Sequence, residues 1–229
     1  MTSYANMVED KGIAYARAHI DIDFLNKLIG PVIKELYIYT AKQQRRFIRP
    51  VLREEKAFGL DWFIEKINQY FNDWLLSKVV LPISQTTIKF VQETLDKAIA
   101  EGWSVQETVN ALKDTELAKQ RARTIVRTES VSAMNYATIT QGQSEEFETT
   151  KEWVAIEDGR TRRSHSHAGV DGEKIDINGR FSNGLRFPGD KEGSAKEVIN
   201  CRCTLAIRAK RDQNGKIIFK QNAIQVPGI

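Results

Sequence analysis

Apolar side chains recur every three or four residues along the first two thirds of the chain, which is the pattern of amphipathic helices. The first long stretch begins near Asp21 and ends at a group of arginines before Pro50. Gly30-Pro31 predicts a kink or a restart inside it, because proline lacks the N–H that a helix interior needs. Its apolar positions are Ile22, Leu25, Leu28, Ile29, Val32, Ile33, Leu36 and Tyr37.

A second helix is expected at about 60–80, where aromatic and aliphatic residues form a broad stripe that Pro82 closes. Such a stripe is more typical of a core or a helix–helix interface than of a ligand site. A third helix is expected at about 84–100, with Gly102 as its C-terminal cap. The stripe consists of Trp62, Phe63, Ile67, Tyr70, Phe71, Trp74 and Leu75.

Two further helices are predicted from their starting residues. Ser104 and Glu107 have the spacing of a capping box, which predicts a short helix to about Lys113. A last long helix should run from about 115 to 140. Charged residues along it predict a salt-bridge network on the helix surface, and they are Arg121, Arg123, Arg127 and Glu129.

The pattern changes after this helix. Residues 141–150 are polar and rich in Glu and Thr, which favours a hinge or linker. Strand-like runs follow at 153–156 and 198–207, the second with apolar residues at alternate positions. Residues 217–219 could pair back on the second run across Asn214-Gly215, a sequence typical of a type I′ turn.

These elements predict an α+β protein in two parts. Residues 1–145 should form a mostly helical domain, and residues 146–229 a small, loop-rich module that contains β-strands. The N-terminus has no basic segment followed by an apolar one, and no run reaches about 18 apolar residues. We therefore expect neither a secretory signal nor contact with a membrane.

Charge is unevenly distributed between the two parts. Residues 1–150 hold 19 Lys and Arg against 20 Asp and Glu, whereas residues 151–229 hold 15 against 10. The basic C-terminal third suits an anionic partner such as nucleic acid, although a mildly basic solvated surface is an equally good interpretation. The candidate nucleic-acid contacts are Arg160, Arg162, Arg163, Arg208, Lys210 and Arg211.

The small module also concentrates the metal-binding residue types. His165 and His167 form one close pair, and Cys201 and Cys203 form another. Two nitrogen and two sulfur donors are what tetrahedral zinc requires, and a small loop-rich module gains stability from such a metal. The cysteines are too close in sequence for an unstrained disulfide, so reduced thiols or metal ligands are expected. Surface histidines with buried thiols remain the alternative, because the spacing is not that of a standard zinc finger.

Several blocks of the sequence resemble the phage Mu F-like minor head proteins. The order and spacing of the blocks match closely between about residues 85 and 207, and Asn-Cys-Arg-Cys after Pro-Gly-Asp is the most specific part. The blocks are Arg121–Glu129, Asn135, Trp153 with Ala155, Asp158-x-Arg160-Thr161-Arg162, His165-x-His167, Gly172, Phe181-x-Asn183-Gly184-Leu185, Phe187-Pro188-Gly189-Asp190 and Val198-Ile199-Asn200-Cys201-Arg202-Cys203.

The resemblance implies a low-copy virion component that acts in head morphogenesis. It implies association with the portal protein and the capsid or scaffold, and non-specific contact with packaged double-stranded DNA during its retention or delivery. The helical domain would dock on the portal or capsid through its aromatic stripe. The protein would be located in the capsid interior or at the portal vertex, and in the host cytoplasm during assembly.

The resemblance also bears on the metal. Other members carry Cys-x-x-Cys where His165 and His167 stand here, and a shared structural zinc site tolerates that exchange. Larger relatives append toxin or ADP-ribosyltransferase domains, and the 22 residues after Ile207 leave no room for one.

Two other classes of function are weaker interpretations. A metal-dependent nuclease or transferase would need an open metal position, whereas four protein ligands close the shell. The sequence also lacks a recognisable nucleophile–base pair or phosphate loop. A nucleic-acid-binding regulator ranks last, because no helix-turn-helix, finger or ribonucleoprotein motif is present.

Overall fold

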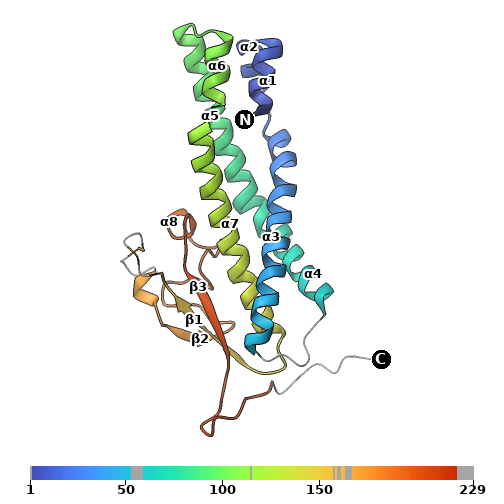
Figure 1. Cartoon of the computed structure of the whole chain (residues 1–229), viewed down its shortest axis with the longest axis vertical. Helices are drawn as coiled ribbons and strands as arrows, with labels where there is room; N and C mark the ends of the chain where they lie inside the picture. Colours follow the sequence, from blue (N-terminus) through green and yellow to red (C-terminus); the bar gives the residue numbers. More distant parts are fainter. Residues whose placement is uncertain are drawn as a thin grey trace. The chain divides into compact units, whose positions relative to one another are not determined.

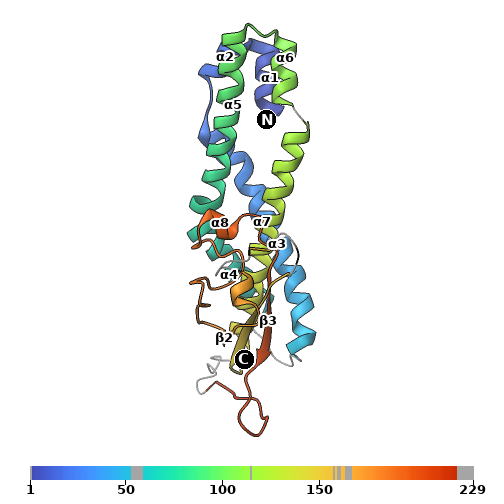
Figure 2. The same ribbon diagram turned by 90° about the vertical axis from the view of Figure 1, so that its left-hand side faces the viewer.

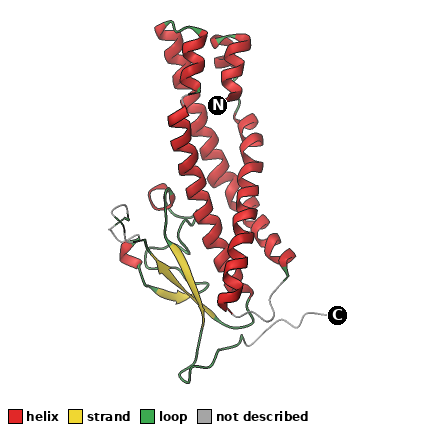
Figure 3. Cartoon of the chain, in the orientation of Figure 1, coloured by secondary structure: helices red, strands yellow, loops and turns green. Residues whose placement is uncertain are grey.

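A computed structural model of the chain describes residues 2–52, 59–113, 115–156, 158, 161–162 and 167–220. Helices make up most of its first two thirds, and a small antiparallel sheet follows, which confirms the predicted α+β class (Figure 1, Figure 3). None of the helices in the described ranges combines the length and apolarity needed to cross a membrane.

The helical part consists of seven α-helices and one π-helical segment among the described residues. They are α1 (Thr2–Lys11), α2 (Ile13–Ala18), α3 (Ile22–Leu52), α4 (Leu60–Tyr70), the π-helix η1 (Phe71–Val80), α5 (Leu81–Glu101), α6 (Val105–Leu112) and α7 (Thr115–Ser144). The C-terminal part consists of β1 (Thr149–Val154), the 3₁₀ helix η2 (Ala168–Val170), β2 (Lys174–Asp176), α8 (Ala195–Val198) and β3 (Thr204–Ala209).

The chain packs into two compact units, and each unit takes two separate segments of the sequence. Unit 1 comprises the described parts of Met1–Lys34 and Asn72–Thr124, and unit 2 those of Glu35–Phe71 and Ile125–Ile229. Helices α3 and α7 contribute residues to both units.

Unit 1 is a helical bundle in which α1 and α2 lie beside α5 and α6 (Figure 1, Figure 2). Ion pairs join Arg17 to Asp96 at 2.5 Å and Lys113 to Glu9 at 3.0 Å. The buried core is aliphatic with one tyrosine, and it consists of Tyr4, Ala5, Val8, Ala16, Leu25, Val91, Leu95, Val109 and Leu112.

Local helix signals in unit 1 are confirmed. Gly102 has a left-handed φ of 68° and ends α5, a conformation that glycine adopts without a Cβ penalty. The Ser104 hydroxyl accepts the Glu107 N–H at 3.2 Å, and the Glu107 carboxylate accepts the Ser104 N–H at 2.8 Å. Both halves of the predicted capping box are therefore formed at the start of α6.

Two predicted helix ends at prolines, Pro50 and Pro82, are wrong. Helix α3 includes Pro50 and also continues through Gly30-Pro31, so that of the predicted kink or restart the restart does not occur. The hydrogen bond lost at an internal proline costs about 3 kcal/mol, which burial of Leu25 and Ile33 on either side offsets. Pro82 does not close a helix but lies in the first turn of α5, where its missing N–H needs no partner.

In unit 2, an antiparallel sheet of strand order β2-β1-β3 packs against α7 (Figure 1). Trp153 on β1 pairs with Leu205 on β3 in register, and both are buried. Part of the aromatic stripe of the second predicted helix lies in this unit's core, where Phe63, Ile67 and Tyr70 are buried. Those three side chains are therefore not available as a docking surface.

The predicted linker at 141–150 is wrong. Helix α7 extends to Ser144, and β1 begins at Thr149. The polar side chains are buried because they satisfy one another: Gln141 donates to Glu145 at 2.9 Å and accepts from Arg45 at 3.0 Å. Thr149 closes the turn by donating to the Gly142 carbonyl at 3.0 Å. This polar segment is therefore a packed connection and not a hinge.

The C-terminal strand region is partly as predicted. Val198 ends α8 and the regular strand begins only at Thr204, yet Cys201, Cys203, Leu205 and Ile207 are all buried as their alternation indicates. The chain reverses after β3 and brings Ile218 N–H to the Lys210 carbonyl at 3.0 Å. The turn is not type I′, which needs two positive φ angles, because Gly215 alone has one there. Asp212 stabilises this longer loop by accepting the N–H groups of Asn214 and Lys216.

Candidate metal centre

Three buried side chains meet beside β3. His167 precedes η2, Cys201 follows α8, and Cys203 directly precedes β3. Asn200 has a φ of 58° between α8 and Cys201, a left-handed conformation that asparagine tolerates better than most residues. Its N–H donates to the Thr128 hydroxyl of α7 at 3.0 Å, which fixes this turn against the helix.

The donor atoms fit a tetrahedral metal ion. His167 Nδ1 lies 3.1 Å from Cys203 Sγ and 3.7 Å from Cys201 Sγ, and all three donor atoms lie within 4.8 Å of one another. Zinc–ligand bonds at tetrahedral angles separate nitrogen from sulfur by about 3.6 Å and the two sulfurs by about 3.8 Å. All three residues are at most 3% exposed. The arrangement can therefore hold a metal, and both cysteines are free thiols as predicted.

The second ring nitrogen of His167, Nε2, contacts Glu197 of α8. His167 Nε2 lies 3.1 Å from the Glu197 carbonyl oxygen and 3.4 Å from its carboxylate Oε2. The ring also lies edge-on to the indole of Trp153, with centroids 5.5 Å apart and planes at 90°. These contacts set the plane of the imidazole, so that Nδ1 points at the two sulfurs.

The surroundings of the two thiols favour a single thiolate. The pKa of Cys203 is lowered, first by a hydrogen bond with Cys201 and then by His167. The pKa of Cys201 is raised, first by that same hydrogen bond and then by burial. A thiolate is the form in which cysteine binds metals, so the cluster is electrostatically prepared for a cation.

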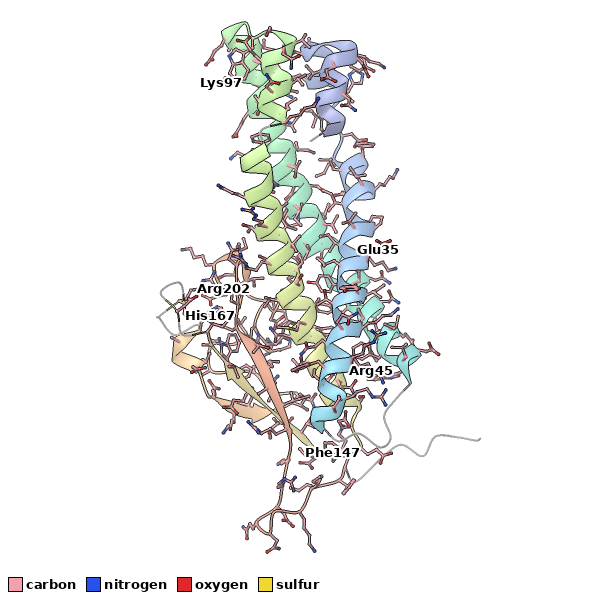
Figure 4. The ribbon with its side chains drawn as sticks, viewed as in Figure 1. Glu35, Arg45, Lys97, Phe147, His167 and Arg202 are labelled. Atoms are coloured by element: carbon pink, nitrogen blue, oxygen red, sulfur yellow. The ribbon has the colours of Figure 1, made fainter. Side chains whose placement is uncertain are left out.

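Arginines hold the backbone around the cluster. Arg162 donates to the Ile199 carbonyl at 2.5 Å and to the Glu197 carbonyl at 3.5 Å. Arg202, which lies between the two cysteines in the sequence and is labelled with His167 in Figure 4, forms a two-point ion pair with Asp158. One bond of this pair is 2.6 Å long. These two arginines therefore position the segments that carry the ligands.

The predicted metal ligands are brought together as far as the structure describes them. His167, Cys201 and Cys203 meet, while His165 lies outside the described residues. Glu197 was not predicted, because nothing in the sequence distinguishes it from other glutamates of the module.

The predicted nucleic-acid contacts do not form one described group. Arg162 lies at the metal centre, and Arg160 and Arg163 lie outside the described residues. The other three lie at the end of β3 and just beyond it. Arg208 is exposed and 3.9 Å from Glu152, Lys210 pairs with Glu148 at 2.7 Å, and Arg211 donates to the Gly215 carbonyl at 2.7 Å.

A buried polar network on α7 also differs from the prediction. Glu129 does not pair along the helix surface with Arg123 or Arg127; its carboxylate lies 2.8 Å from Lys191 Nζ and accepts the Tyr37 hydroxyl at 2.9 Å. Burial is the first reason that the pKa of Tyr37 is raised, and the charge of Glu129 raises it further. Glu129 is therefore paired and inaccessible, which does not suit a catalytic base.

Asn135 of α7 connects the helix to the ligand-bearing strand. Its amide donates to the carbonyls of Pro188 at 3.0 Å and Cys203 at 3.1 Å, and its oxygen accepts the Leu205 N–H at 3.0 Å. The Pro-Gly-Asp and Cys-Arg-Cys blocks are thus held by one side chain. Gly189 packs so closely on α7 that a Cβ there would lie 3.1 Å from Ser132 Cα.

Comparison with known proteins agrees with this arrangement of blocks. The family model described as "Phage Mu protein F like protein" matches residues 89–206, which include the whole His/Cys/Cys cluster. The chain belongs to this family. It is also 28% identical, over 144 residues, to the uncharacterized protein YqbB of Bacillus subtilis (strain 168), an alignment covering 60% of this chain and 47% of the relative. The chain thus spans about half the length of that relative, and no solved structure matches it.

Proposed function

We propose that this chain is a minor head protein of a tailed bacteriophage, a low-copy virion component that acts in capsid assembly and in DNA retention or delivery. The observation that carries the proposal is membership of the phage Mu protein F-like family across residues 89–206. The proposed partners are the portal protein, the capsid or scaffold, and packaged double-stranded DNA. The proposed location is the capsid interior or the portal vertex.

We further propose that the cluster holds a structural zinc ion. His167, Cys201 and Cys203 would be ligands, with His165 as the fourth expected from the sequence. When bound, the ion would cross-link the segment before η2 to the start of β3 and so stabilise a loop-rich region. Complete burial of the described donors supports a structural role and argues against a catalytic one.

DNA contact is assigned to the end of β3 and the hairpin beyond it. Arg208 and Lys216 are exposed there, beside Lys210 and Arg211. Contact with phosphates would be electrostatic and independent of sequence, so affinity should fall steeply with salt. Arg162 is excluded from this surface, because its guanidinium is engaged with backbone carbonyls at the metal centre.

Quantitative mass spectrometry of purified phage particles and of empty procapsids from a producing lysate tests the head role. Finding the chain in both, at a few copies per portal, is the expected result. Finding it only in the soluble lysate would overturn the proposal, and the metal centre would then have to be tested as an active site.

A further inference from the structure

The two ring nitrogens of His167 have different neighbours. Nδ1 faces Cys203 and Cys201 at 3.1 and 3.7 Å, and Nε2 faces the Glu197 carbonyl and carboxylate at 3.1 and 3.4 Å. A neutral imidazole has one N–H and one lone pair. A cation bound between Nδ1 and the sulfurs needs the lone pair of Nδ1, which leaves the one N–H on Nε2, where both neighbours are acceptors.

The Glu197 side chain is 29% exposed, yet one of its carboxylate oxygens is turned inward toward His167. Its Oε2 is buried and accepts no hydrogen bond from the described residues, although burial of an unpartnered carboxylate oxygen is costly. The residue's own carbonyl already holds the Nε2 proton. What the carboxylate adds is negative charge on the far side of the imidazole, which makes Nδ1 a stronger electron donor.

We propose that Glu197 is a positioning residue of the metal centre, which holds His167 so that Nδ1 is the ligating atom. The inference rests on the proposed zinc site, because only a bound cation gives the carboxylate this role. A carboxylate behind a ligating histidine commonly strengthens metal binding by 10- to 100-fold. Since the Glu197 carbonyl remains in any side-chain variant, the loss on removing the carboxylate should lie at the lower end, roughly tenfold.

The test is a zinc titration of the full chain against a chromophoric chelator, with Glu197→Gln compared to the wild type. Glu152→Gln is the matched control, because it removes one negative charge from the surface of β1, where Glu152 pairs with Lys174 at 3.6 Å. We expect one zinc per wild-type chain, roughly tenfold weaker affinity for Glu197→Gln, and no change for Glu152→Gln. The zinc-free Glu197→Gln protein should melt no lower than the zinc-free wild type, which separates positioning from folding.

A second measurement needs no variant. Long-range nitrogen–proton NMR of the zinc-loaded wild type should place the metal on Nδ1 and the proton on Nε2 of His167. Metal on Nε2, or unchanged zinc affinity in Glu197→Gln, would overturn the role of Glu197 while leaving the zinc site intact. A wild-type chain that binds no zinc would overturn the zinc site itself, and the role of Glu197 with it.

Discussion

Replacing Asn135 should weaken the attachment of the ligand-bearing strand to α7. The side chain is fully buried and makes three hydrogen bonds of 3.0–3.1 Å, two as donor and one as acceptor. A partner that stays buried after losing such a bond costs about 1–3 kcal/mol. Because three partners lose their bonds, we expect Asn135→Ala to lower the free energy of unfolding by at least about 3 kcal/mol.

Asn135→Asp has the same shape but should be at least as damaging. It removes the two N–H donors, so that a carboxylate oxygen faces the carbonyl oxygens of Pro188 and Cys203. Urea unfolding followed by circular dichroism measures both variants. Gln143→Ala is the control, because Gln143 lies on the same helix and its bond to Asn178 is exposed. If Asn135→Ala unfolds within about 0.5 kcal/mol of the wild type, as surface variants do, this account of Asn135 is refuted.

Three further effects follow from the structure. Glu129→Gln should cost about 3–5 kcal/mol by leaving Lys191 buried without a counter-ion, and the double variant with Lys191→Met should recover most of this loss in a urea-based double-mutant cycle. Burial lowers the pKa of Lys151 to about 8 from its usual 10.5. Between pH 8 and pH 10.5 the unfolded chain therefore keeps a proton on Lys151 that the folded chain has lost. Stability should therefore rise from about pH 8 to pH 10.5, and Lys151→Met should remove that rise in urea midpoints measured across the range. Ser104→Ala should lower the stability of unit 1 by about 1 kcal/mol in thermal melts, and a variant indistinguishable from wild type would contradict the capping role.

Features that depend on a few neighbouring residues could be predicted from the sequence. The capping box of Ser104 and Glu107 formed as expected, because both partners lie within one helical turn. The buried positions of 201–207 followed from alternation, although the regular strand starts only at Thr204. The meeting of His167 with the two cysteines followed from donor chemistry, which restricts the residue types that zinc accepts.

Features that depend on distant partners could not be predicted. The polar residues at 141–150 suggested a linker, because their composition does not reveal that Arg45, 96 residues earlier, would reach Gln141. Glu129 was expected to pair along its own helix, whereas its cation comes from Lys191, 62 residues away. In each case the tertiary fold supplied the partner that satisfied a buried polar group.

The interleaved composition of the two units has a consequence for synthesis on the ribosome. Every segment of unit 1 has been translated once Thr124 is made, so this bundle can close while the rest of the chain is still being synthesised. Unit 2 must wait for β3, and until then Trp153 on β1 lacks Leu205, its partner on the neighbouring strand. A chain that terminates before β3 should therefore contain a folded unit 1, while its unit 2 segments expose apolar side chains and are sensitive to proteases.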